Sequence, residues 1–179
     1  MTQGGRNVRR GLFWVLFAAT LVLYGVIVLW SLPQISKAAS GLPPFDLRPL
    51  GYSLDEATAF LAALSGEARD FYLGPQHWLD LFYPALLGAT LIWSILWAFR
   101  EFPLVLRGVL IMPAVAGAVF DWVENAQVAV LLRAEIVAEA AVSAASFATV
   151  AKSMATTLAM VILLAGLARR GWRSWKGMA

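Results

Sequence analysis

The sequence predicts an all-α membrane protein, a four-transmembrane-helix bundle with a short extracytoplasmic amphipathic helix. Three observations predict this fold. The chain of 179 residues is 60% hydrophobic and only 14% charged, whereas a soluble domain has about 45–50% apolar and about 25% charged residues. Four stretches are long and apolar enough to cross about 30 Å of hydrocarbon. Lysines and arginines gather on one side of these stretches, as they do beside membrane spans.

The first span is predicted at about residues 12–32, where LFWVLFAATLVLYGVIVLWSL contains no charged residue. Arg6, Arg9 and Arg10 precede it, as basic residues precede the apolar part of a secretory signal. The apolar run of about 20 residues is longer than the roughly 7–15 residues of a cleaved signal. We therefore expect this segment to be retained as a span.

The outer loop is predicted to cover residues 33–77, and its first part should be irregular because it is rich in Pro, Gly and Ser. Ser53 and Glu56 then form the S-x-x-E pattern of a capping box. Apolar residues at helical spacing predict a short helix from about Leu54 to Leu64, with Gly66 as its stop. We favour a structural lid over a substrate gate for this helix. Gly74-Pro75 should break the chain before the second span.

The remaining spans are predicted at about residues 79–99, 104–130 and 142–167, which makes residues 1–179 a single transmembrane domain. With an even number of spans both termini share one side, which carries nine cations and one anion, Glu101. The other side carries five cations and ten anions. We therefore expect a multi-pass protein of the cell inner membrane with cytoplasmic N and C termini. The basic tail RRGWRSWKG should bind anionic headgroups rather than nucleic acid.

Ionisable residues within the spans predict a buried polar group near the outer face. Counting 1.5 Å per residue from the cytoplasmic cations places the acids of the second and third spans and the lysine of the fourth in the outer third of the bilayer. Residues 121, 124 and 125 share one helix face, because they are spaced i, i+3, i+4. We expect the lysine to meet one or both acids of the third span. The predicted polar group comprises Asp80, Asp121, Glu124, Asn125 and Lys152, with His77 one turn further out.

Several roles for this group remain open. A structural lock is favoured, because paired charges inside a membrane often serve packing. Asp80 and Asp121 could instead form a hydrolytic carboxylate pair, or the acids could belong to a proton or ion path. A fourth role is a lipid or amphiphile site in which Lys152 and Arg69 bind an anionic headgroup. The catalytic residues, if there are any, are unknown, and whether the chain is an enzyme stays open.

Cofactor and metal chemistry receives little support. The chain has no cysteine and a single histidine, His77. The absence of cysteine excludes disulfides, thiolate metal sites and thiol redox chemistry. One histidine cannot build a multi-histidine metal or haem site. We therefore expect no cofactor and no bound metal.

Three segments carry a resemblance to a known group of proteins. They are GYSLDEATAFLAALSGEARDFYLGPQHWLDLFYP, DWVEN in the third span and SFATVAKSMA in the fourth. With them, most of the chain after the first span resembles an uncharacterised family of small four-span bacterial inner-membrane proteins. The resemblance implies a location and no chemistry. The matching positions are Tyr52, Tyr72, Asp80, Pro84, Asp121, Glu124, Asn125 and Lys152.

The expected function is non-enzymatic. Because the sequence contains no complete catalytic constellation, we favour an accessory or scaffolding subunit that contacts the lipid bilayer and packs against a larger membrane protein complex. The alternative is an enzyme or binding protein that acts on a membrane-embedded lipid or peptide at the outer polar group.

Overall fold

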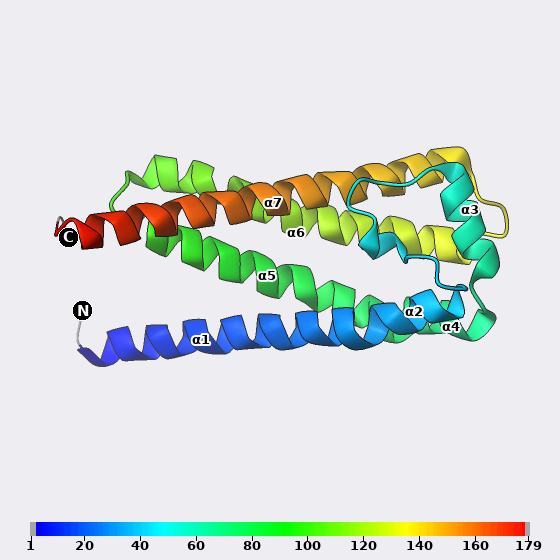
Figure 1. Cartoon of the computed structure of the whole chain (residues 1–179), viewed down its shortest axis with the longest axis horizontal. Coiled ribbons are helices and arrows are strands. Elements are labelled where there is room, and N and C mark those ends of the chain that lie inside the picture. The colour runs from blue at the N-terminus through cyan, green and yellow to red at the C-terminus, as the bar shows by residue number, and fades with distance from the viewer. Residues whose placement is uncertain (1–2, 178–179) are drawn as a thin grey trace.

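The computed structural model describes residues 3–177, and every regular element in that part of the chain is helical. Figure 1 shows four long helices side by side, with both termini at one end of the bundle and the helices α3 and α4 at the other. The elements in chain order are α1 (Gln3–Val26), η1 (Ile27–Ser31), α2 (Leu32–Ala38), η2 (Phe45–Leu47), α3 (Leu54–Ala63), α4 (Gly66–Phe71), η3 (Tyr72–Gln76), α5 (His77–Ala98), α6 (Leu104–Arg133) and α7 (Glu139–Trp175).

Four helical runs are long and apolar enough to cross a membrane, which confirms the predicted four-span architecture. They are Asn7–Ala38, Gly66–Ala98, Leu104–Arg133 and Glu139–Trp175. Each run is longer than the predicted apolar segment. The bilayer fixes the length of the apolar part of a span, but the helix itself continues into the interface until capping or packing ends it.

The structure differs from three expectations about the outer loop. The helix of the first span continues past residue 32, because π-helical η1 and then α2 extend it to Ala38. Gly74-Pro75 does not break the chain, because both residues lie in π-helical η3, between α4 and α5. Wider π bonding lets a helix pass a proline, which has no N–H to donate. Gly66 begins α4 rather than stopping the chain there, since the Ser65 hydroxyl accepts a hydrogen bond from the Ala68 amide at 3.3 Å.

Helix α3 caps the outer end of the bundle. The predicted capping box is present: the Ser53 hydroxyl accepts from the Glu56 amide at 3.2 Å, and the Glu56 carboxylate accepts from the Ser53 amide at 2.8 Å. Phe60 of α3 is fully buried, and its ring centroid lies 4.9 Å from that of Phe45 in η2. These side chains belong to an apolar cluster that includes the outer ends of α6 and α7, so the helix closes the bundle as the sequence predicts.

Helices α6 and α7 pack closely because small residues face each other. A Cβ atom added to Gly117 of α6 would lie 2.6 Å from the Thr156 hydroxyl and 3.3 Å from its backbone nitrogen. Glycine therefore lets these two backbones approach, as small residues do inside membranes. Further toward the termini, Gly166 of α7 lies against Phe99 and Ala98 in the same way.

Helix α1 packs along α5. The Thr20 and Thr90 hydroxyls are hydrogen-bonded at 2.9 Å in the interior. Tyr24 stacks on Tyr83 with ring centroids 5.9 Å apart. These contacts define the inner face of α1, and residues on its opposite side point away from α5.

Candidate functional site

The centre of the site is an ion pair between α6 and α7. The Lys152 ammonium lies 3.3 Å from an Asp121 carboxylate oxygen and contacts the Glu124 carboxylate more closely. The Glu124 side chain is fully buried, whereas those of Lys152 and Asp121 are 15% and 16% exposed. The other Glu124 oxygen accepts from the Thr149 hydroxyl at 2.5 Å. The buried Glu124–Lys152 salt bridge expected from the helix register is therefore present.

Asp80 is held by amides rather than by the lysine. Its carboxylate accepts a hydrogen bond from the Gln76 side chain at 2.7 Å, and the Gln76 carbonyl accepts from the Ser31 hydroxyl. The backbone carbonyl of Asp80 accepts from the Asn125 side chain at 2.8 Å. Asp80 thus connects the first three spans, while the ion pair connects the third and fourth.

The outer loop contributes an acid that the sequence analysis did not predict as a site residue. Asp46 in η2 accepts a hydrogen bond from the hydroxyl of Tyr72 in η3, and the Tyr72 side chain is buried. The loop around it is fixed by Arg48, which donates two hydrogen bonds to the Pro43 carbonyl at 3.1 and 2.8 Å. The guanidinium of Arg48 also lies 5.9 Å from the Phe60 ring centroid in α3. Packing of the loop therefore brings Asp46 to the bundle.

We call these neighbouring sets of polar contacts together the outer polar network. It takes side chains from all four spans and from the outer loop. Its members are Ser31, Asp46, Tyr72, Gln76, Asp80, Asp121, Glu124, Asn125, Thr149 and Lys152.

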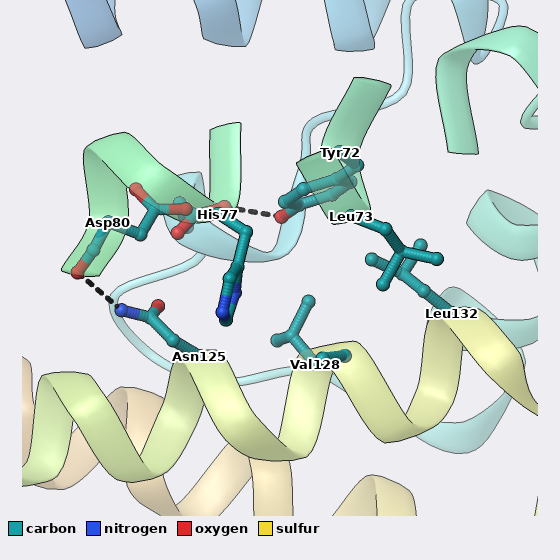
Figure 2. A pocket seen from close by; sticks show the side chains of 9 residues that line it. Tyr72, Leu73, His77, Asp80, Asn125, Val128 and Leu132 are labelled. Carbon is teal, nitrogen blue, oxygen red and sulfur yellow. Dashed lines mark hydrogen bonds between the residues drawn. The ribbon is translucent and has the colours of Figure 1, made fainter. Parts of the chain in front are cut away.

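A small cavity adjoins this network, and His77 lines it. Figure 2 shows His77 and Asp80 on one side of the cavity and Asn125 and Val128 of α6 on the other. Asp46 also lines the cavity, whose volume of about 10 Å³ is enough for about one water molecule. Within residues 3–177 no group of three or more His, Asp or Glu side chains is arranged to hold a metal ion.

Arg69, the second cation predicted to bind a ligand, lies at the junction of the lid with the bundle. Its guanidinium donates to the Leu132 carbonyl at 3.0 Å and to the Leu61 carbonyl at 3.1 Å. These carbonyls lie near the C-terminal ends of α6 and α3, where backbone acceptors have no partner within the helix. Arg69, which lies in α4, therefore links the C-terminal ends of α3 and α6 through hydrogen bonds.

A buried tyrosine lies between the lid and α7. The Tyr52 amide donates to the Ser146 hydroxyl at 2.9 Å, and the Tyr52 ring packs against Phe45 with centroids 4.8 Å apart. Burial raises the pKa of the Tyr52 phenol well above its usual range, so the hydroxyl stays neutral at physiological pH. Gly51 precedes it with a φ of +85°, a left-handed conformation that glycine adopts without strain.

Five members of the network were not predicted as site residues, although Tyr72 was among the positions of the resemblance, and only some of the other four could have been found. Gln76 lies four residues before Asp80, and Thr149 lies three before Lys152. Helical spacing places each pair on one face, so a search for polar neighbours would have found both. Ser31 and Asp46 carry no such signal, because their positions depend on contacts far along the chain.

Comparisons with models of known protein families, with curated proteins and with solved structures find no match for this chain. The resemblance to small four-span bacterial membrane proteins therefore identifies no family, and the four-span architecture is the part of it that the structure supports.

Proposed function

We propose that this protein is a non-enzymatic accessory or scaffolding subunit of a larger membrane complex. The observation that carries the proposal is the outer polar network, which joins all four spans and the outer loop through polar contacts. We expect polar contacts between all four spans to make this end of the bundle rigid. Rigidity suits a protein that holds a fixed surface toward partners, since less conformational entropy is lost on binding.

The charges of the network support a structural role. Lys152 has two carboxylate partners, and one of them, Glu124, also accepts a hydrogen bond from Thr149. Asp80 and Asp46 each accept a hydrogen bond from a neutral side chain. Buried charges that are paired in this way stabilise one arrangement of the helices, whereas removing one partner is costly.

The side of α1 that points away from α5 offers a surface for a partner helix. Gly11, Ala18 and Gly25 recur every seven residues and lie roughly 140–200° around the helix from Thr20, which faces α5. A Cβ atom added to Gly11 or Gly25 would meet nothing within 4 Å. Small residues at such spacing let a second membrane helix approach closely.

The experiment uses one substitution on this face and a matched control. Tagged wild-type protein is extracted from its native membrane in mild detergent, and co-purifying membrane proteins are quantified by mass spectrometry. Ala18→Leu should reduce recovery of the partner complex, whereas Ala19→Leu, equally exposed and about 100° away, should not. Recovery of the wild-type protein as a bare monomer, also after cross-linking in intact membranes, would refute the proposal. The protein is further proposed to lie in a bacterial inner membrane with cytoplasmic termini, as the distribution of basic residues favours.

One observation favours a second candidate, an enzyme or binding protein acting on a membrane-embedded lipid or peptide. Asp46 and Asp80 line the same cavity, which has room for about one water. Two close carboxylates that share a proton can activate a water for hydrolysis. This pair replaces the predicted pair of Asp80 and Asp121, since Asp121 binds Lys152.

The second candidate has its own test. Membranes that contain wild-type protein, Asp46→Asn or Asp80→Asn are compared by lipid and peptide mass spectrometry. A hydrolase predicts that the same uncleaved species accumulates in both variants while the proteins stay folded. Identical profiles with folded variants would exclude it.

A further inference from the structure

A cluster of arginines lies at the opposite end of the bundle, close to both termini. Arg169, Arg170 and Arg173 occupy the last turns of α7 and form ion pairs with Glu101, in the turn between α5 and α6. Figure 1 shows this end of α7 beside that turn. One Glu101 oxygen is 3.2 Å from the Arg169 guanidinium and in closer contact with that of Arg173. The other is 4.0 Å from the Arg170 guanidinium. We call these four residues the arginine cluster.

Two arginines of the cluster have donors that Glu101 does not satisfy. Arg169 Nε and Arg170 Nη1 are buried atoms with no hydrogen-bond acceptor among the described residues. Buried donors without acceptors are unfavourable, so an anion that accepts hydrogen bonds from Arg169 and Arg170 would stabilise this arrangement.

Aromatic rings hold two of the guanidinium groups in place. The Arg169 guanidinium lies 4.5 Å from the Phe102 ring centroid, and that of Arg170 lies 4.2 Å from the Trp97 ring. Arginine stacks on aromatic faces in this way. Trp97 is 49% exposed, and exposed tryptophans at span ends mark the interface of the bilayer. The cluster therefore lies where phospholipid headgroups begin.

We propose that the arginine cluster binds the phosphate of an anionic phospholipid. Planar guanidinium groups match phosphate oxygens through two parallel hydrogen bonds. An anionic lipid brings one uncompensated negative charge to the guanidinium groups of Arg169 and Arg170, whereas a zwitterionic lipid also brings a cation. Exposed apolar side chains of α7, including Leu164 and Leu167, continue from the cluster into the membrane and would contact the acyl chains. The shape and charge of the site thus suit a lipid such as phosphatidylglycerol.

The first arm of the test compares two double variants of the full chain that lose the same charge. Purified protein in detergent is titrated with phosphatidylglycerol or phosphatidylcholine, and bound lipid is measured by native mass spectrometry. Arg169→Gln with Arg170→Gln should weaken phosphatidylglycerol binding about 30-fold, given the usual attraction per basic residue. Arg9→Gln with Arg10→Gln, on exposed turns of α1, should change it less than about threefold. Equal losses in the two variants would overturn the proposal, since only general charge would then matter.

The second arm gives an effect of opposite sign. Glu101→Gln removes the internal competitor for the arginines and should tighten phosphatidylglycerol binding about fivefold. If the cluster were only an internal ion-pair group, this variant would lose thermal stability and leave lipid binding unchanged, which would overturn the proposal. A third arm adds excess inorganic phosphate. Phosphate that displaces the lipid completely and stabilises the protein as well as the lipid does would identify a soluble anion site and overturn the lipid assignment.

Discussion

Replacing Lys152 with methionine should strongly destabilise the protein. Methionine fills a similar volume without a charge, so the substitution isolates the electrostatic contribution. The Glu124 carboxylate, which is fully buried, would lose its cation, and Asp121 would lose a partner at 3.3 Å. Breaking a buried ion pair from one side typically costs about 3–5 kcal/mol. For a chain of this length that cost corresponds to a fall in Tm of roughly 6–20 °C.

The assay is thermal unfolding of the purified protein in detergent or nanodiscs, followed by tryptophan fluorescence or circular dichroism. Lys37→Met is the matched control, because Lys37 is exposed near the same end of the bundle and should change stability by less than about 0.5 kcal/mol. Adding Glu124→Gln to Lys152→Met should recover at least half of the loss, because the buried charge disappears while an oxygen remains for Thr149. A Lys152→Met protein that melts within about 2 °C of wild type would refute the reasoning. So would a double variant less stable than the single one.

Three further predictions concern packing and capping. Gly117→Ala should destabilise the protein by about 1–3 kcal/mol, because the new methyl group would lie 2.6 Å from the Thr156 hydroxyl. Gly108→Ala is the control. A Cβ atom there has no neighbour within 4 Å, so this variant should leave Tm unchanged in the same thermal assay. Ser53→Ala removes the N-cap of α3 and should lower the stability of that helix by about 1 kcal/mol. Hydrogen exchange should become faster in α3 alone. An equal increase in exchange rate across the whole bundle would contradict this prediction. Hydrogen bonds from Ser53 lower the pKa of Glu56 in the folded protein. The Glu56 carboxylate therefore stabilises α3 fully above the ordinary carboxyl pKa, and this stabilisation is lost as the pH falls through the lowered pKa of Glu56. Glu56→Gln should remove that acid-side decline, measured by hydrogen exchange of α3 between about pH 5 and about pH 2; an unchanged decline would contradict the prediction.

Local patterns were enough to predict the spans and the start of the lid helix. A run of about 20 apolar residues meets the requirement of the bilayer wherever the rest of the chain lies. The capping box at Ser53 and Glu56 is equally local, since both partners lie within one helical turn. The same locality explains the error at Gly74-Pro75, where a rule about turns cannot detect that the flanking helices continue through a π-helical segment.

The Glu124–Lys152 ion pair was also predictable, and the reason lies in the membrane. Spans that start from the same basic interface rise by 1.5 Å per residue, so depth can be compared between helices that are far apart in sequence. Antiparallel neighbours then bring residues of equal depth together, as they do for Gly117 and Thr156. A soluble helical protein offers no such common reference plane.

What the sequence determined by itself is the number of spans and which residues share a helix face, because each of these depends only on residues within one helical segment. Only the tertiary structure placed Asp46 at the outer polar network and Glu101 among three arginines. Both acids lie in short connections between the long helices, whose course is set by the packing of distant side chains. Such contacts follow no period along the chain, so the sites they complete emerge only when the helices and loops are assembled.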